Sequence, residues 1–218
     1  GQRSRSRGLL VRLVMAISAI GLFLVSYQWG NQYQQEAKGP PNLRGVMVRP
    51  PQPLPEFQLF DSDGRPFERH ALREHWTLLV FASPASAQGH RSIHRQIAIY
   101  NQLGDRSQLR RELQLVNLSL DLSPRLAAEF QRLSPAIRLL QGTADEVEAL
   151  REALGASEQP VPDQLPPLFL IDPLARLAAL FPESLSSEAI AEDLRALDDW
   201  PGARVETAEQ ATSAFNPD

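Results

Sequence analysis

The sequence of 218 residues contains no cysteine. This absence excludes disulfide bonds, thiolate metal ligands, thioester intermediates and thiol redox chemistry within the chain. The chain also has no net positive charge: its formal net charge is -4, and no basic stripe with interleaved aromatic residues lies outside the N-terminus. We therefore expect no nucleic acid as a partner. A glycine-rich phosphate-binding loop is absent as well, which argues against a nucleotide site of that type.

One long apolar run stands near the N-terminus. Residues 9–29 are interrupted only by Arg12, and they match the ~20 residues that a helix needs to cross ~30 Å of hydrocarbon. Arginines are concentrated in residues 1–8, so the positive-inside rule places that segment in the cytoplasm and the rest of the chain across the membrane. The alternative is a cleaved signal peptide, but its apolar region should be only ~7 to 15 residues long and end in small side chains. Tyr27 and Trp29 are bulky, and we expect an uncleaved, single-pass anchor in the lipid bilayer.

The remainder of the chain divides into a linker, one domain and a tail. Residues 30–55 are rich in proline, which favours an extended, semi-rigid linker. Residues 56–200 have the length and the strand and helix pattern of one α/β domain. Residues 201–218 form a polar tail.

Within residues 56–200, short apolar runs predict strands. Residues 57–60 and 66–67 flank a turn and predict a small hairpin. Continuous apolar runs predict strands that are buried on both faces of a sheet, at residues 77–81, 113–120 and 168–171. Residues 177–181 predict an antiparallel partner at the edge of that sheet.

Amphipathic helices are predicted between these strands. Their apolar residues recur at helical spacing, in the groups Ile93, Ile97, Tyr100; Leu126, Phe130, Leu133; and Val147, Leu150, Leu154. Alternation of strands and helices predicts parallel pairing of the strands. A final helix is expected to begin after Ser186 as its cap and to reach about Leu197.

The order of these elements resembles the Sco/SenC family of thioredoxin-fold proteins, which are membrane-anchored factors that help insert copper into cytochrome c oxidase. The resemblance covers roughly residues 53–197. It is carried by the opening segment 57–64, the strand that ends at Phe81, the strand that ends at Asp121, and residues 168–173. It implies an α/β, thioredoxin-like fold with a central mixed sheet flanked by helices, preceded by one N-terminal transmembrane helix.

The same resemblance implies where copper ligands should be, and this sequence lacks them. Family members carry Cys-x-x-x-Cys a few residues after the first buried strand, and the corresponding positions here are Ser86 and His90. The family's copper-binding His aligns with Gln164. Cu(I) favours soft sulfur ligands, and the sulfur of this chain is confined to Met15 and Met47, in the predicted span and the predicted linker. We therefore expect neither a bound metal nor another cofactor.

Two other uses of this segment remain possible. His90 and His94 are four residues apart, which places both imidazoles on one helix face where they could bind a divalent metal. The candidates for a third and fourth ligand are the nearby Ser86 and the distant Asp163 or Gln164, and all three are poor metal ligands. The interleaved Arg91 and Arg95 favour a solvated basic helix face instead. Ser86 and His90 could also suggest a nucleophile and its base, but no nucleophile elbow surrounds the serine, and a capped helix start is the better interpretation.

Several further residues have structural interpretations. Pro166 stands where thioredoxin folds keep a cis-proline loop, so a cis bond is plausible there. Asp121 and Asp172 end predicted strands and are expected to form turns or caps. His70 and His75 are expected at the surface.

The functional hypothesis is a catalytically inert, membrane-anchored protein that binds the subunits or assembly proteins of a respiratory cytochrome oxidase. Its anchor would lie in a bacterial inner membrane and its main domain in the periplasm. Either a transient assembly factor or a permanent accessory subunit fits this hypothesis. One alternative is a metal-binding protein that uses His90 and His94 in periplasmic copper or metal handling, and a residual alternative is a thioredoxin-fold enzyme of unknown activity.

Overall fold

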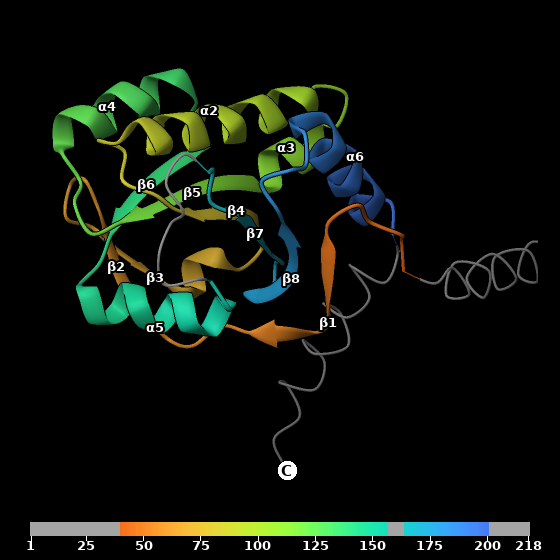
Figure 1. Ribbon diagram of the computed structural model, residues 1–218, viewed down its shortest axis with the longest axis horizontal. Helices are drawn as coiled ribbons and strands as arrows, with labels where there is room; N and C mark the ends of the chain where they lie inside the picture. The colour runs from red at the N-terminus through yellow and green to blue at the C-terminus, as the bar shows by residue number, and fades with distance from the viewer. Residues whose placement is uncertain (1–39, 157–163, 201–218) are drawn as a thin grey trace, which may run out of the picture.

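The computed structural model describes residues 40–156 and 164–200 (Figure 1). Several predictions fall outside these ranges, namely the basic segment 1–8, the span 9–29, Asp163 and the tail 201–218. Among the helices of the described ranges, none combines the length and the apolar character that crossing a bilayer requires.

One mixed sheet organises the described residues. Its eight strands follow the order β1-β8-β7-β4-β5-β6-β2-β3. Strands β4, β5 and β6 pair in parallel, and the other pairings are antiparallel. The strands are β1 (Val46–Pro53), β2 (Gln58–Asp61), β3 (Pro66–Glu68), β4 (Trp76–Phe81), β5 (Leu113–Ser119), β6 (Ile137–Gln141), β7 (Leu168–Ile171) and β8 (Arg176–Phe181).

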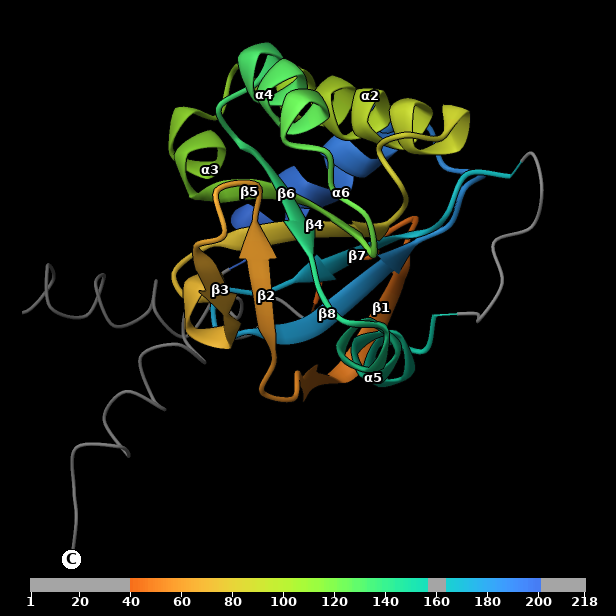
Figure 2. The same cartoon turned by 90° about the vertical axis from the view of Figure 1, so that its left-hand side faces the viewer.

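Helices cover both faces of this sheet. Helices α2, α3, α4 and α6 lie over one face, and α5 lies over the other (Figures 1 and 2). A short 3-10 helix, η1, precedes β4. The helices are η1 (Arg69–Leu72), α2 (Ala87–Gln102), α3 (Ser107–Glu112), α4 (Pro124–Leu133), α5 (Ala144–Leu154) and α6 (Ser187–Asp198).

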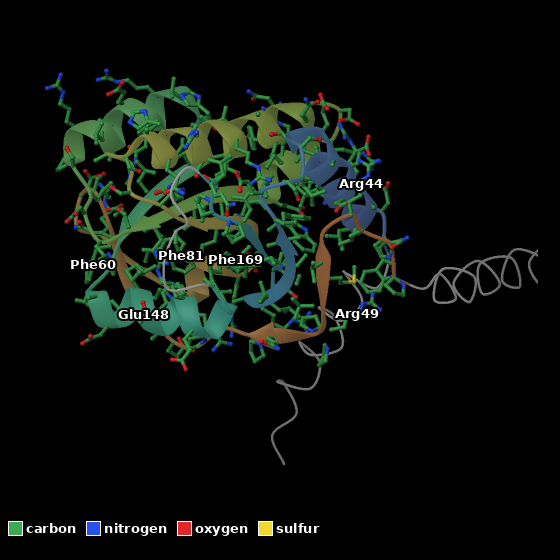
Figure 3. The ribbon with its side chains drawn as sticks, in the orientation of Figure 1. Arg44, Arg49, Phe60, Phe81, Glu148 and Phe169 are labelled. Atoms are coloured by element: carbon green, nitrogen blue, oxygen red, sulfur yellow. The ribbon has the colours of Figure 1, made fainter. Side chains whose placement is uncertain are left out.

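The hydrophobic core has two halves separated by the sheet. Every residue of β4 is buried: Leu78 and Val80 face the layer of four helices, whereas Leu79 and Phe81 face α5. In the second half, the rings of Phe81 and Phe169 meet edge to face with centroids 5.9 Å apart (Figure 3). Burial on both faces explains why β4 is a continuous apolar run rather than an alternating one.

The structure confirms the main predicted elements. The hairpin is β2 and β3, whose register pairs Leu59 with Phe67. The predicted buried strands are β4, β5 and β7. The predicted parallel pairing holds for β4 with β5, but it is wrong for β7, which pairs antiparallel with β4. Helix α6 begins after Ser186, whose side chain accepts a hydrogen bond from the Ala189 amide as an N-cap.

One correction concerns the predicted linker and the edge of the sheet. Residues 46–53 of the expected linker form β1, which pairs with β8. Strand β8 is therefore an inner strand, and the expectation that it lies at the edge is wrong. An edge strand tolerates proline because its outward amides need no partner, and Pro50, Pro51 and Pro53 occupy this edge. The cis peptide bond of the described residues is Arg49–Pro50, not the bond before Pro166.

This correction also changes the position of Met47. The sequence pattern placed both methionines outside the domain, but Met47 belongs to β1 and packs on the core below α6. Strand β6 and helix α3 were not predicted. In β6 the exposed Arg138 lies between the buried Ile137 and Leu139. A strand of five residues interrupted by a charged residue gives only a weak apolar pattern in the sequence.

Candidate functional site

The segment that corresponds to the family's copper loop connects β4 to α2. Ser86 is the N-cap of α2, and its Oγ accepts a hydrogen bond from the Gly89 amide at 2.9 Å. The same hydroxyl donates to the Ser83 carbonyl at 2.9 Å. Because this proton is directed to a backbone oxygen, Ser86 is held as a structural cap. The capped helix start predicted from the sequence is thereby confirmed.

Gly89 brings this loop close to the helix. A Cβ at residue 89 would lie 1.8 Å from the Ser83 carbonyl oxygen and 2.6 Å from its carbon. Both atoms belong to the backbone, so no side-chain rotation could relieve that contact. The loop therefore folds over the first turn of α2 at a separation that only glycine permits.

Gln164 is in contact with the first turn of α2. The side-chain amide of Gln88 donates a hydrogen bond to the Gln164 backbone carbonyl. The Gln164 residue itself is exposed. Thus the segment before β7 is joined to the first turn of α2 by an amide contact.

The two histidines of α2 have different surroundings. His90 is half-buried, and its ring meets the Phe130 ring of α4 edge to face at a centroid distance of 5.0 Å. His94 is exposed. No group of three or more His, Asp or Glu residues that could hold a metal ion occurs among residues 40–156 and 164–200. Asp163, the additional ligand considered from the sequence, lies outside those ranges.

Arg91 and Arg95 also differ, which corrects the prediction of one solvated basic face. Arg91 is exposed, but Arg95 is 8% exposed. One terminal nitrogen of Arg95 donates to the carbonyls of Pro182, Glu183 and Leu185 at 2.9, 3.3 and 2.7 Å. Burial of the cation lowers the pKa of Arg95 below its ordinary value. Arg95 therefore attaches α2 to the loop between β8 and α6.

A buried amide attaches the same helix to the sheet. Gln96 Nε2 donates to the Leu78 carbonyl of β4 at 2.9 Å and to the Val116 carbonyl of β5 at 3.2 Å. With Gly89 at its start and Arg95 at its centre, α2 is fixed at three points. The helix that carries the candidate site is thus firmly positioned, although its side chains provide few reactive groups.

The remaining residues singled out from the sequence have structural roles or lie at the surface. Asp172 forms a turn: its carboxylate accepts from the Leu174 and Arg176 amides, and it pairs with the Arg176 guanidinium at 2.7 Å. His70 and His75 are exposed, as expected. Asp121 is exposed after β5, where its carbonyl accepts from Ser119.

Comparison with known proteins gives a fold. No family model matches the sequence, and no curated protein does. Among solved structures, copper-bound ScoI of Arabidopsis thaliana has a TM-score of 0.57 at 15% identity, over 67% of this chain and 99% of that one. Apo Sco1 of Thermus thermophilus has a TM-score of 0.57 at 19% identity, over 72% of this chain and 97% of that one.

A third structure extends the comparison to lipoproteins. A SCO1/SenC family lipoprotein of Bacillus anthracis has a TM-score of 0.54 at 20% identity, over 70% of this chain and 99% of that one. This chain therefore has the thioredoxin-like fold of the Sco/SenC proteins over nearly the whole length of the three, and it has that fold without a cysteine.

Proposed function

We propose that this chain is a membrane-anchored, non-catalytic binding partner of a respiratory cytochrome oxidase, acting as an assembly factor or as an accessory subunit. The observation that carries the proposal is that polar groups at the start of α2, where the family has its ligands, are engaged in structural hydrogen bonds. The strand and helix of a Sco-type fold are present, yet the Ser86 hydroxyl is hydrogen-bonded to the backbone of Ser83 and Gly89. The Gln88 side chain donates to the Gln164 carbonyl. A scaffold that is kept while its soft ligands are replaced is suited to binding rather than to copper or thiol chemistry.

The link to an oxidase comes from the structural neighbours. One of them is described as a member of the Sco family of cytochrome c oxidase assembly proteins. For the present chain we propose only that it contacts oxidase proteins, and not that it transfers copper. The anchor at residues 9–29 and the position of the domain in the periplasm belong to the same proposal, because the flanking charges favour them.

The metal-binding alternative has less support. It would use His90 and His94, but His90 packs on Phe130, and no third ligand accompanies the pair in the part of the chain that the structure describes. A strong site needs three or four ligands. A thioredoxin-fold enzyme remains the residual alternative, and no described arrangement favours a particular reaction for it.

Co-purification tests the proposed function. The tagged full-length chain is extracted from native membranes in a mild detergent, and bound proteins are identified and quantified by mass spectrometry. We expect oxidase subunits, in a constant ratio to the chain if it is a subunit and in a small fraction if it is an assembly factor. The matched control joins residues 1–39 to an unrelated soluble domain and should recover none of them. If the full chain recovers no more respiratory protein than this control, the proposal is wrong.

A further inference from the structure

A hollow of about 320 Å³ lies at the other end of β4 from the Ser86 loop. It is bounded by β1, by the first residue of β4, by the turn between β7 and β8, and by the end of α6. We call it the β1 hollow. Residues Met47, Arg49, Pro50, Trp76, Leu197 and Trp200 line it, and so does the ion pair between Asp172 and Arg176. The six residues of β4 separate it from the Ser86 loop by about 20 Å.

The lining of the β1 hollow is mostly apolar and aromatic. Trp76 and Leu197 are buried, and Met47 and Trp200 are half-buried, so indole, thioether and aliphatic groups meet there. A concave site of this size with few polar groups is the usual form of a binding pocket. The hollow exists because β1 departs from regular pairing: its register with β8 shifts between Met47 and Gln52. Residues between them form one wall.

Two arginines line the hollow: Arg176, which pairs with Asp172, and the exposed Arg49 of β1 (Figure 3). The guanidinium carbon of Arg49 lies 5.5 Å from the centroid of the Trp200 ring, and its Nε donates to the Met47 sulfur at 2.8 Å. A thioether is a weak acceptor. No carboxylate of the described residues lies within ion-pair distance of Arg49.

We propose that the β1 hollow binds a peptide segment of the partner protein, with an apolar or aromatic side chain inside the hollow and a carboxylate at Arg49. This inference rests on the proposed function and names the surface that performs it. Charge complementarity selects the acidic group, because Arg49 is held over an aromatic ring without an anion of its own. Aromatic and arginine side chains around a desolvated pocket are also the residues that dominate protein interfaces.

The position of the β1 hollow agrees with a partner in the same membrane. The backbone amides of Arg44 and Gly45 donate to Asp193 of α6, so the chain enters the domain beside the hollow. Residues 30–45 connect the predicted anchor to this point, and they extend at most about 55 Å at ~3.3 to 3.6 Å per residue. An extramembrane segment of a neighbouring membrane protein therefore lies within reach.

Small probes test the hollow directly. The full chain is labelled with ¹⁵N in detergent and titrated with N-acetylphenylalanine and, separately, with its uncharged amide, while the indole N–H resonances of Trp76 and Trp200 are followed. We expect both resonances to shift, with the carboxylate binding about tenfold more tightly than the amide. In Arg49→Gln this preference should vanish. Arg73→Gln, which removes an exposed arginine outside the hollow, should retain it.

Two outcomes of the titration would overturn the proposal. The first is the absence of indole shifts up to millimolar probe, or an equal affinity for acid and amide. The second is tighter probe binding by a chain that ends at Trp200, because the occupant would then be the chain's own tail.

Co-purification separates this inference from the proposed function. If the intact chain recovers oxidase subunits and Arg49→Gln recovers them equally, the hollow is not the docking site although the function stands. If probes bind but the intact chain recovers nothing, the oxidase assignment fails instead.

Discussion

At the scale of single residues, Gly89 is the residue of the candidate site at which a substitution should be tolerated least. A methyl group there would overlap the carbonyl carbon and oxygen of Ser83, and both of these atoms belong to the backbone. We predict that Gly89→Ala lowers the free energy of unfolding by about 2 kcal/mol or more, because overpacking outweighs the gain in helix propensity. Denaturant unfolding followed by circular dichroism measures this change.

Gly104→Ala is the matched control for that substitution. A Cβ at residue 104 would lie 3.6 Å from the Asn101 carbonyl oxygen, which is ordinary contact. Its stability should change by no more than about 0.5 kcal/mol. Equal stability of the two variants would show that the loop over α2 can move, and the rigid helix start described above would then be wrong.

The same residues show how far the candidate site could be predicted. The interpretation of Ser86 as the cap of a helix was correct, because capping is a local property of the sequence. Periodicity did not distinguish the solvated Arg91 from the buried Arg95. The difference depends on the carbonyls of the loop at 182–185, about 90 residues later in the chain, and such tertiary partners leave no local signal.

At the scale of elements, the attachment of the segment before β1 to α6 depends on one carboxylate. Asp193 is 5% exposed and accepts from the amides of Arg44 and Gly45 at 3.1 and 2.8 Å. Asp193→Ala would leave two partly buried donors without an acceptor, so we expect a loss of about 1 to 3 kcal/mol in unfolding free energy. Amide hydrogen exchange at Arg44 and Gly45 should accelerate.

Glu192→Ala provides the comparison on the preceding residue of α6. Glu192 pairs with the Arg44 guanidinium at 2.6 Å, but both side chains are 57% exposed. Exposed ion pairs contribute little, so this variant should lose only about 0.5 kcal/mol. If exchange at Gly45 is equally fast in both variants, the buried carboxylate does not hold this segment.

The elements differ in how clearly the sequence indicates them. Strand β4 was predicted because a strand buried on both faces must be continuously apolar. Strand β1 was not predicted, because its prolines are typical of a linker. They fit a strand only once its pairing with β8 on one side is known. Only the register with β8 shows that these prolines occupy a sheet edge, and that register is set by residues more than a hundred positions away.

At the scale of the whole molecule, fold and ligand set are separate properties of this chain. The fold follows from two apolar cores on either side of one sheet. Ser86 caps α2, His90 packs on Phe130 at the outer side of one core, and Gln164 is exposed. The hydrophobic pattern can therefore specify a Sco-type fold although other residues occupy the positions of the family's ligands. This separation explains why the resemblance predicted the architecture correctly although the chain has no cysteine.

This separation predicts that copper binding can be restored without changing the core. Ser86→Cys, His90→Cys and Gln164→His together place two thiolates about one helical turn apart, ~6 Å along the axis, beside an imidazole on the adjoining segment. We expect this triple variant to retain one Cu(I) per chain against a chromophoric Cu(I) chelator, because soft thiolates select this ion. The unmodified chain should retain none.

The control for this experiment moves one cysteine by a further turn. Ser86→Cys, His94→Cys and Gln164→His contain the same three residue types, but positions 86 and 94 are ~12 Å apart along the helix. That separation is too large for two thiolates at ~2.3 Å from one ion, even with side-chain adjustment. If both variants compete equally with the chelator, the binding reflects free thiols, and the correspondence of Ser86, His90 and Gln164 with the family's ligands is wrong.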